Sequence, residues 1–473
     1  MKRLLLKRMT ALILAGAAVF TASPTHAAPD YVAHEWGTFT SIQGADGSLV
    51  DWNGVATVEL PPFVYNSTRP GLGRKMNIGG LASSLSKISF SALQRMETPV
   101  IYFYSKESFR ADVTVQFPKG FITEWFPQAR DIGPSTYGTN STSYTPDVAS
   151  IGDQASSIMP LAEQSAERRV TNSLIHWSNF EVIPQKQESS LADKLPTSYP
   201  ANHYFAARET DSALVRVPSM EQDGTSAEVE KFLFYRGIGN FHTPLKVSVN
   251  AEDEITVTNA SDTPLKRLFA LAIRGEQAVF VPIDPLDPGQ IHQFRMNLQG
   301  DGLSVAEVEN QLSLRVAEAL VAEGLYPAEA NAMVETWRDA WFEDDGVRIL
   351  YVLPRAWTDE ILPISLEPKP RELVRVMVGR AELITRDMED RILDCVTLFR
   401  KQGAQPDVLG QFQALKLGRF ALAAMRIVAD RLKDQSFYND GIALIKASEA
   451  PEAATSTASI TPQATRPLPG HGG

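Results

Sequence analysis

The densest set of polar side chains in the chain lies in the segment HYFAARETD, from His203 to Asp211. If this segment is a β-strand, Glu209 and Asp211 share one face and lie about 6.6 Å apart, at a rise of ~3.3 Å per residue. That spacing suits paired acid and base carboxylates, or two ligands of a hard cation. On the same strand His203 would lie about 20 Å from Glu209, too far to serve the same centre. The alternative is a solvated strand face with Arg208 near an edge.

His34 is the first candidate for a histidine brought to these carboxylates from another strand. Neighbouring side chains of a strand point to opposite faces, so His34 would share a face with Trp36 and Thr38, whereas Glu35 would not. A helical H-E-x-x-H zinc motif is absent, because Thr38 stands where the second histidine is required. The pattern leaves a catalytic or metal-binding role and a structural polar role both open for His34.

Other motif matches are incomplete. Ser84 to Lys87 fits S-x-x-K, but the partner motifs S-D-N and K-T-G are absent from the sequence. The segment Gly71 to Gly80 (GLGRKMNIGG) lacks the order of a phosphate-binding P-loop and is predicted to be an exposed loop. The single cysteine, Cys395, shares an apolar helical face with Met388, which favours a packing role. The sequence therefore identifies neither a cofactor nor a metal.

The elements that must position these residues change in type along the chain. Short strands are predicted from Tyr31 to about Leu298, with a hairpin over Leu245 to Asn259. At Ser304 a capping box begins a helix that runs to Gly324, and a second helix starts at Pro327. We predict an α+β fold, with a β-rich, sandwich-like domain over residues 29–300 and a mixed, mainly helical domain over residues 301–447.

Both ends of the sequence have distinctive compositions. Residues 1–28 combine a basic start, an apolar run and small residues, which predicts a cleaved secretion signal and a soluble periplasmic or secreted protein. Residues 448–473 are rich in Ala, Ser, Thr, Pro and Gly and are predicted to form a disordered tail. The formal net charge of −11 disfavours nucleic acids and anionic membrane surfaces as partners, and one cysteine allows no internal disulfide.

Four blocks resemble a family of uncharacterised secreted bacterial proteins. They are HEWGTFTS (His34 to Ser41), METPVIYFYS (Met96 to Ser105), EKFLFYRG (Glu230 to Gly237) and RVMVGRAELIT (Arg375 to Thr385). The resemblance spans most of the mature chain and implies export. It implies no reaction, and it transfers no catalytic residue.

Two functional hypotheses follow from the sequence. The first is an exported protein that binds a glycan, peptide or protein partner through its β-rich region, where Trp36, Trp52, Trp125 and Trp177 could stack on sugars or could simply be core. The alternative is a metal-dependent or carboxylate-based hydrolase that uses Glu209, Asp211 and His34. The ligand and the oligomeric state are left open.

Overall fold

The computed structural model describes residues 28–52, 60–66, 92–134, 173–198, 202–218 and 227–449. It confirms the α+β class, because large sheets form in the first two thirds of the chain and helices concentrate near the end. The predicted secretion signal and tail, the S-x-x-K match and the glycine-rich loop lie wholly or largely outside the described residues. No helix in the described part is long and apolar enough to cross a membrane.

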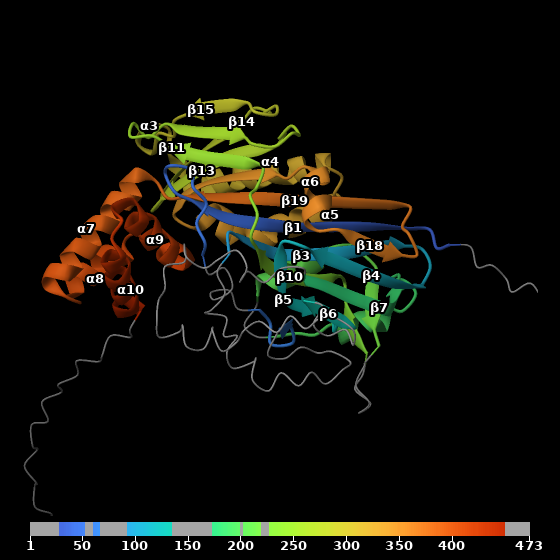
Figure 1. Ribbon diagram of the computed structural model, residues 1–473. Coiled ribbons are helices and arrows are strands. Elements are labelled where there is room, and N and C mark those ends of the chain that lie inside the picture. The colour runs from blue at the N-terminus through green and yellow to red at the C-terminus, as the bar shows by residue number, and fades with distance from the viewer. Residues whose placement is uncertain are drawn as a thin grey trace, which may run out of the picture.

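A ten-stranded mixed sheet forms the centre of the protein (Figure 1). Its strands, in spatial order, are β16 (Leu303–Ser304), β14 (Gln277–Ile283), β13 (Leu268–Arg274), β17 (Gly346–Val352), β19 (Glu372–Leu383), β1 (Tyr31–Gln43), β3 (Gln94–Ser105), β10 (Leu233–Gly239), β5 (Gly120–Phe126) and β2 (Tyr65–Asn66). Strand β1 pairs in parallel with β19 and antiparallel with β3. The sheet contains strands from both sides of residue 300, where the sequence predicted a domain boundary.

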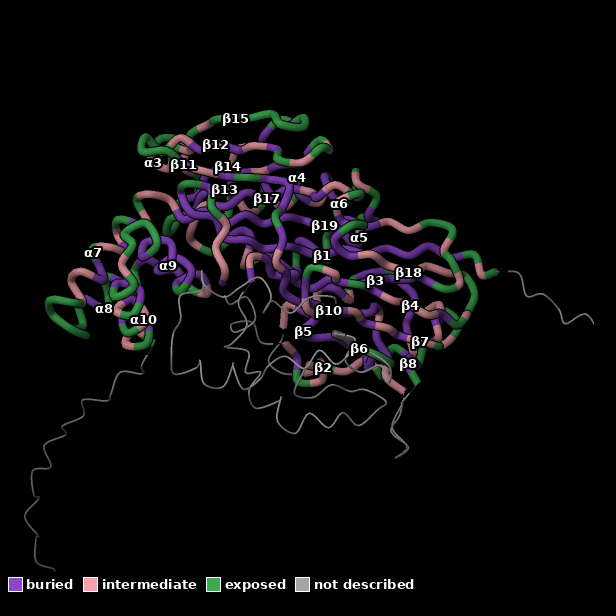
Figure 2. Tube along the Cα trace, in the orientation of Figure 1, coloured by how far each residue is buried: buried purple, intermediate pink, exposed green. Residues whose placement is uncertain are grey.

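The strands at the middle of this sheet are covered on both faces. All thirteen residues of β1 are buried, and Figure 2 shows the same for most of β3 and β19. The blocks that carry the family resemblance coincide largely with four adjacent strands, β19, β1, β3 and β10. Continuous burial explains why these blocks are rich in apolar residues rather than strictly alternating.

Two smaller sheets pack on one face of the central sheet around a shared core. The first contains β18 (Ile364–Glu367), β4 (Phe109–Phe117), β7 (Ser173–Ile183), β8 (Leu214–Val217), β9 (Glu228–Glu230) and β6 (Asp131–Pro134). The second contains β11 (Leu245–Val249), β12 (Ile255–Asn259) and β15 (Ile291–Phe294). The β11–β12 pair confirms the hairpin predicted from alternation.

Helices cover the opposite face and one end. The helices and helical turns are η6 (Ser189–Lys194), η7 (His203–Arg208), α3 (Leu298–Asp301), α4 (Val305–Ala322), α5 (Pro327–Arg338), η8 (Asp339–Glu343), α6 (Arg355–Ile361), α7 (Arg386–Gln402), α8 (Pro406–Gln413), η9 (Gly418–Phe420), α9 (Ala421–Leu432) and α10 (Gln435–Glu449). The predicted capping box at Ser304 is present, with both of its hydrogen bonds. Helices α7 to α10 form a bundle at one end, around a separate core that contains the buried Cys395 (Figure 1).

The strand predicted over residues 203–211 is wrong, because residues 203–208 form the 3₁₀ turn η7. The side chain of Asn202 accepts a hydrogen bond from the backbone N–H of Tyr204 and caps the turn. Tyr204 and Ala207, three residues apart, then point into the core together. The buried apolar residues of this segment are spaced as in a helix, but the polar residues at its two ends suggested a strand.

Candidate functional site

The alternation of β1 places Thr38 and Thr40 on the face of the central sheet that the helices cover, beside the core residue Trp36. Cross-strand pairing fixes their neighbours, because Thr38 pairs with Glu97 and Thr40 with Arg95 on β3. On the other side, Thr40 pairs with Arg380 of β19. Charged side chains from two strands therefore meet in the middle of the sheet.

Glu97 is the shared counter-ion of this group. Its Oε1 atom lies 3.1 Å from Nε of Arg95 and 2.7 Å from Nη1 of Arg419, which lies in the turn η9 directly before α9. Next to them, Arg236 of β10 makes a two-point ion pair with Glu124 of β5, with a shortest distance of 2.7 Å. We call the set Arg95, Glu97, Glu124, Arg236 and Arg419 the arginine cluster.

Many polar atoms around the arginine cluster are buried without a hydrogen-bond partner from the described part of the chain. They are Thr38 Oγ1, Thr40 Oγ1, Trp52 Nε1, Arg95 Nη1, Glu97 Oε2, His203 Nε2, Trp337 Nε1, Trp341 Nε1, Arg380 Nη1 and Arg419 Nη2. Leaving one such atom unsatisfied typically costs about 1–3 kcal/mol, and native proteins leave few of them. Ten around one cluster indicate a site that water or a ligand fills.

The charges of the cluster shift one another's pKa values. Burial raises the pKa of Glu97, but the charges of Arg419, Arg95 and Arg380 outweigh burial and lower this pKa to about 2. Burial is the largest cause that lowers the pKa of Arg95 to about 9, and Glu97 opposes this decrease. Glu97 is therefore held as a carboxylate at neutral pH.

His203 borders the cluster as a neutral side chain. Burial, followed by the charge of Arg236, lowers the pKa of the imidazole to about 4. Its ring lies 5.9 Å from the ring of Trp337, which in turn stacks on Trp341 at 6.4 Å. Both tryptophans are in the core. Their indole N–H groups add neutral donors to the site.

A π-helical turn, η8, supports this wall of the site. The guanidinium of Arg348 donates to the carbonyl of Trp341 at 3.0 Å and to that of Asp344 at 2.5 Å, and it pairs with Glu382 at 3.2 Å. A π-turn leaves carbonyls without their usual helical partners, and Arg348 binds them here. Single π-turns occur frequently at functional sites.

The backbone is strained beside Glu97. Thr98 has φ = 47°, an uncommon conformation for a β-branched residue, and it is buried in a β-bulge between β1 and β3. Opposite the bulge, a Cβ atom on Gly37 would lie only 2.9 Å from Cα of Pro99, so glycine permits the close approach. Strain of this kind clusters at functional sites, which supports the assignment of the site.

The structure does not gather the three residues proposed from the sequence. His34 is buried, with Nδ1 2.6 Å from Oε2 of Glu329, and this bond joins β1 to the first turn of α5. Glu209 and Asp211 are exposed and interact with Lys231. In the described ranges, no group of three or more His, Cys, Asp or Glu side chains is arranged to hold a metal ion.

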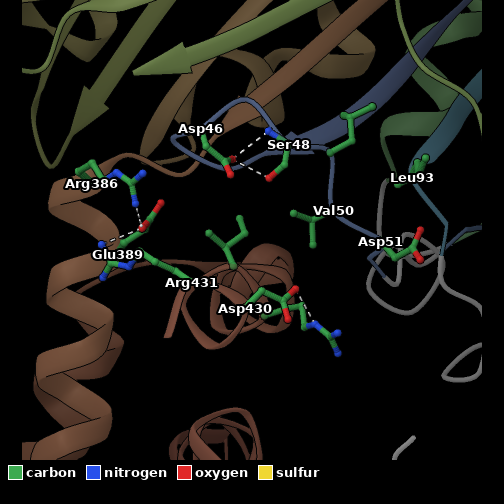
Figure 3. Close-up of a pocket in the computed structure, with 12 residues that line it drawn as sticks. Asp46, Ser48, Val50, Asp51, Leu93, Arg386, Glu389, Asp430 and Arg431 are labelled. Atoms are coloured by element: carbon green, nitrogen blue, oxygen red, sulfur yellow. Dashed lines mark hydrogen bonds and ion pairs between the residues drawn. The ribbon is translucent and has the colours of Figure 1, made fainter. Parts of the chain in front are cut away.

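A solvent-open cavity of about 460 Å³ is lined by residues that follow β1 and by residues of α7 and α9 (Figure 3). Its lining contains four carboxylates and three guanidinium groups, and Glu389 among them lies 2.8 Å from Arg386 and 3.0 Å from Arg431. Asp51 and Leu93 also line it, and in the chain they lie next to Trp52 and two residues before Arg95.

The arginine cluster was not predicted from the sequence, although the sequence contains one signal that points to it. The signal is that Arg95, Glu97 and Arg236 stand next to or inside strongly apolar strand segments. Charges inside such runs are rarely buried unless they are paired. Which charges pair depends on contacts between distant segments of the chain, such as Glu97 and Arg419, which are 322 residues apart.

Comparisons with known proteins identify no relative. No family model and no curated protein sequence matches the chain. Among solved structures, the chain is similar to the Mu homology domain of Fcho1 from Danio rerio, solved with a bound Eps15 peptide. The identity is 7%, the match covers 76% of this chain and 98% of that chain, and the TM-score is 0.26. A similarity this weak carries no argument about fold or function.

Proposed function

We propose that the protein is an exported binding protein that takes a small anionic, oxygen-rich ligand at the arginine cluster. The observation that carries the proposal is the set of buried donors without partners in the described residues, among them Arg95 Nη1 and Arg419 Nη2. Guanidinium groups bind carboxylates and phosphates through paired, charge-assisted hydrogen bonds.

The composition of the site favours binding of a small molecule over binding of a protein surface. The polar atoms are buried in the middle of a covered sheet, and ligand pockets combine apolar walls with a few converging polar groups in this way. The indole groups of Trp337 and Trp341 supply the apolar part. The solvent-open cavity in Figure 3 is lined in part by Asp51 and Leu93, which are close in the chain to Trp52 and Arg95 of the site.

The experiment is calorimetric titration of the purified mature protein with a panel of small carboxylates, inorganic phosphate and neutral sugars. We expect saturable binding of at least one anion and weaker binding of every neutral compound of similar size. Absence of binding by all anions, in a protein that unfolds cooperatively, would contradict the proposal.

A pair of variants tests the location. Arg419→Gln should weaken anion binding roughly 10–100-fold, the range expected for a lost charge-assisted hydrogen bond. Arg400→Gln is the matched control. Arg419 lies 4.9 Å from the ring of Phe420, and Arg400 likewise lies 5.6 Å from a phenylalanine ring but pairs at 2.6 Å with Asp440, a carboxylate outside the cluster. Equal effects of the two substitutions would place the site elsewhere.

A further inference from the structure

The solvent-open cavity in Figure 3 is a second candidate for a small-molecule site, and it does not depend on the ligand of the arginine cluster. The cavity lies between the turn that follows β1 and the helices α7 and α9. Its volume of about 460 Å³ lies within the range of about 300–1,000 Å³ that is typical of ligand pockets.

The turn after β1 presents a carboxylate to this cavity. Gly47 has φ = 80°, which favours glycine, and its N–H donates to the carbonyl of Gly44 at 2.8 Å. Within this turn, Asp46 Oδ1 accepts hydrogen bonds from the backbone N–H of Ser48 at 2.9 Å and from its hydroxyl at 2.6 Å. The hydroxyl is the main cause that lowers the pKa of Asp46, and the charge of Arg386 adds to the decrease. Asp46 is therefore a carboxylate at neutral pH.

Helix α9 presents guanidinium donors to the same cavity. The side chain of Arg426 is only 8% exposed, and its Nε donates to Asp430 at 2.9 Å. No other described residue accepts a hydrogen bond from Arg426. Because Arg426 lines the cavity and is otherwise buried, its Nη1 and Nη2 groups need an acceptor that enters the cavity, either water or a ligand.

The rest of the lining includes aliphatic side chains. Val50, Leu93 and Ile427 line the cavity, and in Figure 3 Val50 lies between Asp46 and Asp430. The lining contains no aromatic side chain among the residues that the structure describes. Such a surface suits an aliphatic group and offers no flat ring on which a sugar could stack.

We infer that the cavity binds a zwitterionic amino acid or short peptide with aliphatic side chains. The ligand carboxylate accepts hydrogen bonds from Arg426, the ammonium group donates to Asp46, and an aliphatic side chain packs on Val50. A ligand with only a negative charge is repelled by Asp46, and one with only a positive charge leaves the N–H groups of Arg426 without an acceptor. A neutral ligand makes weaker hydrogen bonds to both.

The test is calorimetric titration of the purified protein with four probes of similar size. They are leucyl-leucine, N-acetyl-leucyl-leucine without the ammonium group, leucyl-leucine amide without the carboxylate, and maltose. We expect leucyl-leucine to bind at least about 5-fold more tightly than the other three, as loss of one charge-assisted bond at a partly exposed site predicts. The inference is overturned if any of the other three binds as tightly, or if leucyl-leucine does not bind.

Arg426→Gln tests the carboxylate end and should weaken leucyl-leucine binding roughly 10–100-fold. Arg400→Gln is the matched control, because Arg426 and Arg400 each lie 5.6 Å from a ring, of Tyr438 and Phe437, and each pairs with a carboxylate, but Arg400 does not line the cavity. Equal effects of the two substitutions would overturn the inference. Arg419→Gln should leave leucyl-leucine binding unchanged, and an equal loss there would place the peptide at the arginine cluster instead.

Asp46→Asn tests the ammonium end and remains informative if Arg426→Gln does not fold, because Asp46 is exposed. Asparagine keeps the Oδ1 acceptor for Ser48. We expect roughly 3–5-fold weaker binding of leucyl-leucine and no loss for N-acetyl-leucyl-leucine, which has no ammonium group. Asp434→Asn is the matched control, since Asp434 Oδ1 accepts from the N–H and hydroxyl of Ser436 at the same 2.9 and 2.6 Å, outside the cavity. An equal loss for both peptides, or no loss for leucyl-leucine, would contradict the assigned ammonium contact.

Discussion

Replacing Glu97 by the neutral glutamine should destabilise the protein, and the neighbouring arginines determine by how much. Arg419, Arg95 and Arg380 lower the pKa of this carboxyl group from 4.5 to about 2, despite the opposing effect of burial. Lowering the pKa from 4.5 to about 2 corresponds to about 3 kcal/mol of stability at neutral pH, and breaking a buried ion pair typically costs about 3–5 kcal/mol. We therefore expect Glu97→Gln to lower the free energy of unfolding by about 3 kcal/mol at pH 7.

The pH dependence has a fixed sign. Because the folded pKa lies below the unfolded value, the contribution of Glu97 is fully present above pH 4.5 and is lost as the pH falls toward about 2. In urea unfolding, the free energy of unfolding of the wild type should exceed that of Glu97→Gln by about 3 kcal/mol at pH 7. At pH 3.5 this difference should be smaller by about 1 kcal/mol. A gap below about 1 kcal/mol at pH 7, or one that widens in acid, would refute the assigned role of Glu97.

Three further predictions concern neighbouring features. Gly37→Ala should lower the free energy of unfolding by about 1–3 kcal/mol because its Cβ would meet the backbone of Pro99, and an unchanged urea midpoint would contradict the close approach. His203 should titrate near pH 4 by NMR, so its contribution to stability is present above pH 6.5 and is lost as the pH falls toward 4, whereas a midpoint above 6 would mean that the ring faces solvent. Burial raises the pKa of Cys395, so a thiol reagent at pH 7 should label it only after denaturation, and rapid labelling of the native protein would show an exposed thiol.

Local patterns were enough to predict most of the elements. The change from strand to helix near Ser304 follows from its capping box, which the structure contains. The segment that begins at His203 was misassigned because two exposed carboxylates at its end suggested alternation, while Asn202 favoured a capped turn. Short 3₁₀ turns leave a weak periodic signal in a sequence.

The arginine cluster could not be predicted from local sequence patterns. An arginine between apolar residues of a strand can point to solvent or to a buried partner. Arg95 is buried, and this follows from its ion pair with Glu97 and its strand pairing opposite Thr40, which the local sequence does not reveal. That pairing depends on the register of β1 against β3, which the bulge at Thr98 shifts by one residue. The third cation, Arg419, comes from the distant helical bundle. Long-range register and docking, rather than residue type, create the site.

The most direct test is a high-resolution crystal structure of the protein grown with a small anion such as inorganic phosphate. We predict non-protein density at the cluster, with oxygen atoms of the anion within hydrogen-bonding distance of Arg95 Nη1 and Arg419 Nη2. The assignment of a ligand site would be contradicted if the cluster held no non-protein density and these two atoms and His203 Nε2 were hydrogen-bonded to protein groups.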